Sequence, residues 1–221
     1  MENNTKLYNI AIKRDDKLTE FEIELTPDST ILDALEQIRF NIDSSLTYRH
    51  SCHHGSCGTC ACLINGTEKL ACMTFLSEFE NNKITIEALN SFKIISDLVV
   101  DISQMISQMP ITNYLRDSEV SQESIKPNGI FSWKRFENCI ECGSCYSACP
   151  VVDNSFIGPA SLAAINNELK KEIHSTEKET LKTLAYSKNG VEKCEEHYAC
   201  SRVCPTKVYP GKHINELRKN K

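Results

Sequence analysis

Twelve cysteines in a chain of 221 residues constrain the fold more than any other feature. They fall into two groups, and residues 73 to 138 between the groups contain none. Neighbouring cysteines often have two residues between them, a spacing that suits metal ligation better than disulfide-stapled loops. The N-terminus lacks the charged start and apolar run of a signal peptide, which argues against a secreted disulfide protein. We therefore expect the cysteines to bind metal.

The first group contains five cysteines, and four of them have the plant-type spacing for a 2Fe–2S cluster, C-x4-C-x2-C plus a distant fourth. The predicted ligands are Cys52, Cys57, Cys60 and Cys72. Gly55 and Gly58 would let the loop curl closely around the cluster. Ser56 and Thr59 could offer hydrogen bonds toward the cluster sulfurs.

A zinc site with four cysteines is the alternative for this group. Zinc sites usually pair two C-x2-C knuckles, and this group has only one, so we favour the 2Fe–2S cluster. The fifth cysteine, Cys62, is expected to point away from the cluster and to behave as a small buried hydrophobe. His53 and His54 lie inside the loop and are interpreted as surface residues.

The second group contains two related runs, "CIECGSCYSACP" at 139–150 and "CEEHYACSRVCP" at 194–205. In two-cluster ferredoxins the first three cysteines of a run bind one cluster and the fourth binds the other. Two ligand sets follow from this crossing. The set for a 4Fe–4S cluster is Cys139, Cys142, Cys145 and Cys204. The set for a 3Fe–4S cluster is Cys149, Cys194 and Cys200.

When the two runs are aligned on their final Cys-Pro, His197 occupies the position that matches Cys142 of the first run. It could ligate a fourth iron, because imidazole binds iron, and the third cluster would then be 4Fe–4S. We favour a side chain that fills the vacant corner, because the ligands of such clusters are mostly thiolates.

The predicted fold class is α+β. Strands are expected at 7–12, 21–25 and 83–89, a helix within 26–42 capped by Ser29 or Thr30, and a hairpin over 60–72 with Asn65-Gly66 as its turn. Together these elements fit a β-grasp, plant-type ferredoxin domain over residues 1–95. Residues 96–221 are expected to form an α-helical, bacterial-ferredoxin-like domain. Its predicted elements are helices within 97–109, 161–173 and 177–187, and a polar surface loop at 116–129.

The net charge and the hydropathy of the sequence limit the classes of partner that we expect. The formal net charge of −5 argues against a nucleic-acid partner. No apolar run approaches the roughly 18–20 residues needed to cross a bilayer, so any membrane attachment would come through partner proteins.

The chain resembles the iron–sulfur subunit of succinate dehydrogenase and fumarate reductase. Beyond the cysteines, "TILDALEQI", "SLTYRHSC", "CGTCACLING", "DLVVDISQ" and "FIGPA" are similar to family segments in family order. The resemblance implies an electron-transfer subunit of an enzyme complex, without a substrate site of its own and with no catalytic residue. It implies a partner flavoprotein with covalent FAD, a membrane-anchor subunit, and quinone at the 3Fe–4S end. It also implies a peripheral position on the cytoplasmic side of a prokaryotic membrane.

Three features of the sequence depart from the family pattern. "CHHG" stands where relatives usually have "CREG", Glu195 stands where many have histidine, and the only tryptophan, Trp133, precedes the cluster motif instead of following Cys149. We hypothesise an altered quinone pocket and an anchor with heterodisulfide-reductase-like modules. Two alternatives stay open: a relay for another flavoprotein, such as a glycolate or glycerol-phosphate oxidase, and a zinc-stabilised interaction module.

Overall fold

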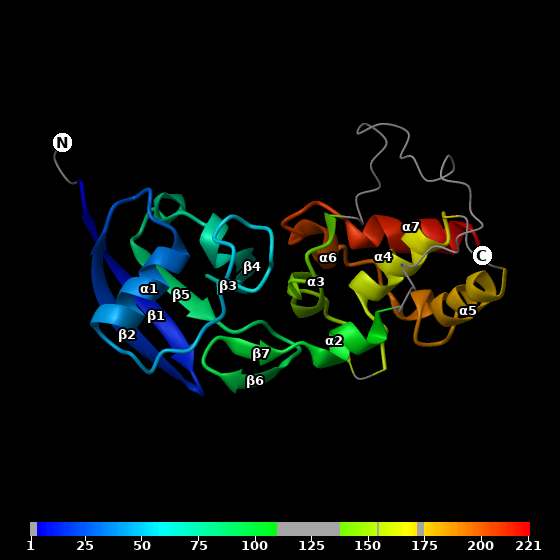
Figure 1. Cartoon of the computed structure of the whole chain (residues 1–221), viewed down its shortest axis with the longest axis horizontal. Helices are drawn as coiled ribbons and strands as arrows, with labels where there is room; N and C mark the ends of the chain where they lie inside the picture. Colours follow the sequence, from blue (N-terminus) through cyan, green and yellow to red (C-terminus); the bar gives the residue numbers. More distant parts are fainter. Residues whose placement is uncertain (1–3, 110–137, 154, 172–174) are drawn as a thin grey trace.

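The computed structural model describes residues 4–109, 138–153, 155–171 and 175–221. Figure 1 shows the sheet at one end of the long axis and most of the helices at the other. This arrangement confirms the predicted α+β class and the order of the two parts. The predicted loop at 116–129 and Trp133 lie outside the described residues.

A five-stranded sheet forms the N-terminal part, with strand order β2-β1-β5-β3-β4 (Figure 1). Its strands are β1 (Lys6–Arg14), β2 (Lys17–Leu25), β3 (Ala61–Ile64), β4 (Thr67–Leu70) and β5 (Lys83–Glu87). β5 runs parallel to β1, and the other pairs are antiparallel. The alternation in β1 buries Tyr8, Ile10 and Ile12, as a half-buried strand requires. The predicted hairpin turn is present, because Asn65 and Gly66 both have positive φ.

Helix α1 (Ile31–Asn41) packs against this sheet. Thr30 is its N-cap and forms a capping box with Asp33, which satisfies backbone donors that a helix start otherwise leaves free. Ile31, Leu35 and Ile38 are fully buried, so the predicted apolar face is confirmed. The helix and the sheet together hold the long cysteine loop that follows at residues 51–60.

The predicted helix over 97–109 is wrong in its first half. β6 (Lys93–Ser96) pairs with β7 (Val99–Asp101) as a two-stranded ribbon, and α2 covers only Ser103–Gln108. The β-branched pair Val99 and Val100 favours a strand, and the pairing with β6 decides between the two conformations.

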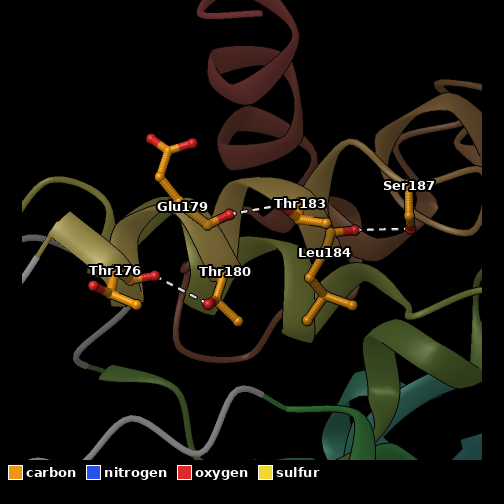
Figure 2. Close-up of a pocket in the computed structure, with 6 residues that line it drawn as sticks. All are labelled: Thr176, Glu179, Thr180, Thr183, Leu184 and Ser187. Carbon is orange, nitrogen blue, oxygen red and sulfur yellow. Dashed lines mark hydrogen bonds between the residues drawn. The ribbon is translucent and has the colours of Figure 1, made fainter.

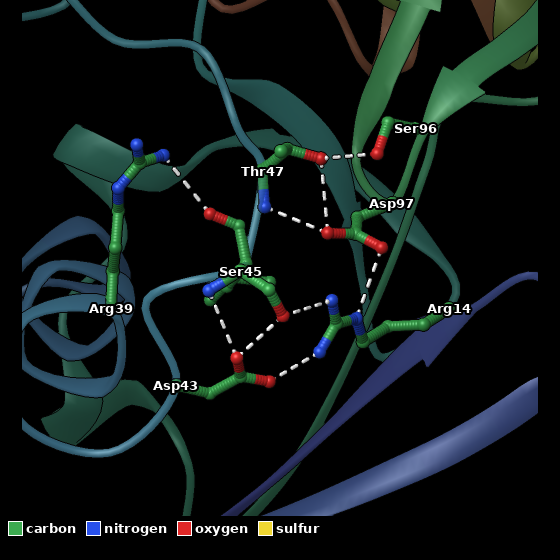
Figure 3. A network of polar contacts seen from close by, with 8 residues as sticks. Arg14, Arg39, Asp43, Ser45, Thr47, Ser96 and Asp97 are labelled. Atoms are coloured by element: carbon green, nitrogen blue, oxygen red, sulfur yellow. Dashed lines mark hydrogen bonds and ion pairs between the residues drawn. The ribbon is translucent and has the colours of Figure 1, made fainter.

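A polar network fixes this ribbon to the first sheet (Figure 3). Arg14 Nε donates to Asp97 Oδ1 at 3.0 Å, and the same guanidinium pairs with Asp43. The Thr47 N–H donates to Asp97 Oδ2 at 2.7 Å. The division near residue 95 therefore falls inside a ribbon that is anchored to the N-terminal part, and that boundary stays a prediction.

The C-terminal part is helical. Its elements are α3 (Ser144–Ser147), α4 (Pro159–Glu168), α5 (Ser175–Ala185), η6 (Val191–Lys193), α6 (Ala199–Arg202) and α7 (Pro210–Lys219). Every residue of α4 is buried, and its main partner is α7. The helices predicted within 161–173 and 177–187 correspond to α4 and α5. No helix in the described ranges is both long enough and apolar enough to span a bilayer.

The two parts meet through close contacts. A Cβ added at Gly58 would lie 2.7 Å from Cys142 Cβ and 2.7 Å from the Ile140 carbonyl oxygen, so the two cysteine loops touch backbone to backbone. Ser147 Oγ donates to the buried Glu68 carboxylate at 2.8 Å, which links α3 to β4. These contacts set how near the two groups of cysteines come to each other.

Candidate metal centres

All twelve cysteines lie in the described part of the chain and are free thiols. None of the eleven predicted ligands is fully exposed, and they gather at three places along the molecule. This is the arrangement expected when thiols bind inorganic clusters and not one another.

The first centre is built from the loop at 51–60 and the end of the β3–β4 hairpin. Cys52, Cys57 and Cys60 lie on the loop, and Cys72 lies in η1 (Ala71–Met73), directly after β4. The Ala71 N–H donates to the Cys60 carbonyl at 3.1 Å and so brings Cys72 back beside Cys60. The thiols interact in sequence: Cys52 with Cys57, Cys57 with Cys60, and Cys60 with Cys72.

Backbone N–H groups point at the sulfur of Cys52. The amides of Ser56 and Cys57 donate to Cys52 Sγ at 3.2 and 3.3 Å. Backbone hydrogen bonds, that of His54 first, lower the pKa of Cys52 to about 6. An anionic sulfur ligand benefits from the same donors. Among the predicted side-chain donors, Thr59 Oγ1 lies 3.1 Å from Cys57 Sγ, whereas the contact of Ser56 comes from its backbone.

Positive φ at Gly55 and Gly58, 75° and 73°, gives the loop its tight course, as predicted from the glycines. Cys62 lies on β3 and is 3% exposed, so its predicted burial is confirmed. Burial raises the pKa of its thiol, which keeps it neutral. His53 and His54 are exposed, also as predicted.

The second centre is a cavity lined by Cys139, Cys142 and Cys145 of the first run and by Cys204 of the second. The remaining wall is largely apolar and includes Met105, Ala160, Ala163 and Val208. The Val208 N–H donates to Cys204 Sγ at 3.2 Å. Four thiols facing one enclosed, mostly apolar cavity fit a cubane cluster.

The third centre is a neighbouring cavity lined by Cys149, Cys194 and Cys200. Burial raises the pKa of Cys200 to about 11, so the free thiol would be neutral, and an iron ion would take the place of the proton. Each of the two cysteine sets predicted from the crossing rule therefore lines one cavity of its own. The last cysteine of each run, Cys149 or Cys204, lines the cavity of the other run.

His197 lines the third cavity beside the three cysteines. Its side chain is 50% exposed, and its Nε2 lies 3.1 Å from Glu195 Oε2. The imidazole is therefore at the open side of the cavity and bonded to a neighbouring carboxylate, so ligation by His197 stays an untested alternative.

The three centres form a series. Gly58 of the first loop touches Cys142 of the second centre. Helix α3, which carries Cys145 of the second centre, packs against α6, which carries Cys200 of the third. Sequence reasoning did not find the Gly58–Cys142 contact or the backbone donors, because backbone amides and contacts between distant segments leave no motif.

A separate hollow lies over α5 and is lined by Thr176, Glu179, Thr180, Thr183, Leu184 and Ser187 (Figure 2). The hydroxyls of Thr180, Thr183 and Ser187 bond to carbonyls of the same helical segment at 2.8–3.0 Å. None of these six described residues is a cysteine or a histidine, and the Glu179 carboxylate pairs with Lys182 at 2.9 Å, so we do not assign a cofactor to this hollow.

Comparisons with known proteins agree with the geometry. Residues 5–107 match the family of 2Fe–2S iron–sulfur cluster binding domains, and residues 135–208 match the family of 4Fe–4S dicluster domains. The fumarate reductase iron–sulfur subunit of Haemophilus influenzae is 33% identical, with 95% of this chain and 88% of the relative covered. The subunit of the same name from Mycobacterium tuberculosis is 32% identical, with 96% and 88% covered.

A solved structure supports the fold. A chain of the Mycobacterium smegmatis Sdh1 complex in the apo form superposes with a TM-score of 0.82 at 24% identity, and 98% of this chain and 95% of that chain are covered. Because the match runs through both cysteine-bearing parts in one chain, neither part alone explains it. The chain belongs to the family of fumarate reductase iron–sulfur subunits.

Proposed function

We propose that this chain carries electrons between a flavoprotein subunit with covalent FAD and a quinone at a membrane-anchor subunit. The clusters supply one-electron transfer, and their potentials respond to hydrogen bonds and solvent exposure. The observation that carries the proposal is the series of three cysteine centres, in which the first loop contacts the second centre and the helices that carry Cys145 and Cys200 pack against each other. Membership of the family supplies the expected partners.

The proposed ligands are the cysteine sets of the three centres. The 2Fe–2S ligands are Cys52, Cys57, Cys60 and Cys72. The 4Fe–4S ligands are Cys139, Cys142, Cys145 and Cys204. The 3Fe–4S ligands are Cys149, Cys194 and Cys200. We further propose residues 1–95 and 96–221 as the two domains, and a peripheral position on the cytoplasmic side of the membrane.

The protein contributes surroundings that suit these groups. Apolar side chains and the α4 helix exclude water from the second centre. Backbone amides hold the sulfurs of Cys52 and Cys204 in place.

Cysteine variants of the anaerobically purified full chain test the ligand sets. The wild type should hold about nine irons, the sum of the three cluster types. Cys204→Ala should remove the 4Fe–4S signal first, and Cys149→Ala should remove the 3Fe–4S signal of the oxidised protein, as measured by EPR and iron analysis. Cys62→Ala is the matched control, because Cys62 is a buried thiol outside the three sets, and it should keep all three centres.

Two results would contradict the proposal. Loss of the 4Fe–4S signal in Cys149→Ala and of the 3Fe–4S signal in Cys204→Ala, the reverse of the expected pattern, would reject the crossing of the two runs. Stoichiometric zinc in a colourless protein would favour an interaction module.

A separate experiment tests the electron acceptor: the chain is reconstituted with the flavoprotein and anchor encoded beside it. Fast quinone reduction through an ordinary two-helix anchor would reject the altered pocket and the heterodisulfide-reductase-like anchor.

A further inference from the structure

Three side chains outside the cysteine sets converge on the surface beside the first centre. Glu36 projects from α1, His50 precedes the cysteine loop, and His53 lies in the loop between Cys52 and Cys57. His50 Nδ1 lies 2.9 Å from His53 Nε2. Glu36 Oε1 lies 3.7 Å from the same atom of His50 and 3.6 Å from that of His53. We call these residues the Glu36 triad.

The spacing of the triad matches the donor shell of a small metal ion. Zinc bonds of about 2.0–2.2 Å in a tetrahedron place neighbouring donors roughly 3.3–3.6 Å apart. The three distances in the triad, 2.9, 3.6 and 3.7 Å, lie around that range. Adjustments of a few tenths of an ångström would bring the three donor–donor distances to the values of a tetrahedral zinc site.

The surroundings keep the triad in place and leave it open. The Tyr48 ring lies against His50 with centroids 5.4 Å apart, and the Arg39 guanidinium lies over the Tyr48 ring, 5.8 Å from its centroid. The side chains of His50, His53 and Glu36 are 41%, 44% and 27% exposed, so water can complete a coordination shell. His54, the next residue in the loop, bonds to the Cys52 carbonyl and is not part of the triad.

We propose that Glu36, His50 and His53 bind one divalent transition-metal ion of the zinc type, with water as the fourth ligand. Two imidazoles and one carboxylate are a donor set that zinc uses in proteins when one position stays open. Imidazole donors favour Zn²⁺ and Cu²⁺ over Mn²⁺ and disfavour Mg²⁺ and Ca²⁺. A bound ion ties α1 to the cysteine loop and places two positive charges beside Cys52.

Zinc titration of the anaerobic, cluster-loaded full chain tests the proposal. Calorimetry should find one Zn²⁺ per chain, with binding at least tenfold weaker in His50→Gln and in His53→Gln. His54→Gln is the matched control, since it removes a histidine from the same loop, and it should bind zinc as the wild type does. Mg²⁺ should give no saturable binding.

Iron content and visible absorption are followed in the same titration, because displaced clusters would free thiols for zinc. Zinc uptake accompanied by iron loss, or uptake unchanged in His50→Gln and His53→Gln, would overturn the proposal. The absence of saturable binding in the wild type would leave the triad as a hydrogen-bonded network and would overturn it as well. Glu36→Gln tests the carboxylate ligand alone, because it keeps both imidazoles. In each variant a full iron content shows that the fold is intact, so weakened zinc binding then reflects the lost ligand and not misfolding.

A second measurement uses Co²⁺ as a paramagnetic probe. Bound Co²⁺ should broaden the EPR signal of the reduced 2Fe–2S cluster, and the broadening should disappear in His53→Gln. This measurement rests on the proposed ligation by Cys52, whereas the zinc stoichiometry does not. A zinc site without broadening would therefore count against the cluster assignment, and the lack of zinc binding would count against the triad alone.

Discussion

Adding one methyl group at Gly58 should disrupt the contact between the N-terminal and C-terminal parts of the molecule. In Gly58→Ala, the new Cβ would meet Cys142 Cβ and the Ile140 carbonyl oxygen at 2.7 Å, and Cys142 Cα at 3.0 Å. The Ile140 oxygen and Cys142 Cα belong to the backbone, and Cys142 Cβ is bonded directly to it, so none of the three atoms can rotate away. The residue also has φ of +73°, which disfavours any side chain.

The cost of the substitution has two parts. The left-handed backbone costs about 1–2 kcal/mol for a residue with a Cβ. Overpacking in a closed contact adds about 1–3 kcal/mol. Gly66 isolates the first part, because it has nearly the same φ, +74°, and nothing within 4 Å of an added Cβ. Gly66→Ala should therefore cost about 1–2 kcal/mol, and Gly58→Ala should cost more than that.

The assay is thermal unfolding of the cluster-loaded full chain at one scan rate, followed by circular dichroism and by iron–sulfur absorption. In a chain of this length 1 kcal/mol corresponds to about 2–4 °C. The midpoint of Gly58→Ala should lie at least about 2 °C below that of Gly66→Ala. Equal midpoints for the two variants would refute the argument that the cysteine loops are in closed contact at Gly58.

Three smaller predictions use the same unfolding measurement. Ser147→Ala leaves the buried Glu68 carboxylate without its 2.8 Å donor and should cost about 1–3 kcal/mol. Thr30→Ala removes the N-cap of α1 and should cost about 1 kcal/mol. Burial lowers the pKa of His213 to about 4 from about 6.5 in the unfolded chain, so the unfolded state binds more protons and stability falls as the pH drops through this window. Between about pH 7.5 and 5.5 the loss should be roughly 1 kcal/mol, and His213→Gln should flatten this slope; an unchanged slope would contradict it.

Local patterns predicted the elements whose stability is local. The capping box at Thr30 and the spacing of Ile31, Leu35 and Ile38 specify α1 without help from the rest of the chain. The Asn65-Gly66 turn likewise follows from the two residues that accept positive φ. The cysteine spacings are informative for a similar reason, because a cluster fixes the distances between its ligands, and the chain length between them must suit those distances.

Contacts between distant segments escaped prediction. Val99 and Val100 fit a helix by spacing, and only the pairing with β6 makes them a strand. The Glu36 triad joins residues from a helix and a loop, so no linear motif contains it. The hydrogen bond between Glu68 and Ser147 spans 79 positions, and neither residue differs in type from an ordinary surface residue. Such sites depend on tertiary packing, which a single sequence does not display.

Gly58 takes part both in a local sequence pattern and in a contact between distant segments. Its place between Cys57 and Cys60 suggests a tight cysteine loop, and the structure uses its positive φ for that purpose. The missing side chain has a second effect, since it lets the first centre approach the second to the distance of a backbone contact. Electron transfer between centres depends on their separation, so a larger residue here would affect the proposed relay as well as stability. We therefore regard the joint at Gly58 and Cys142 as part of the candidate function, although it contributes no ligand that the cysteines do not already supply.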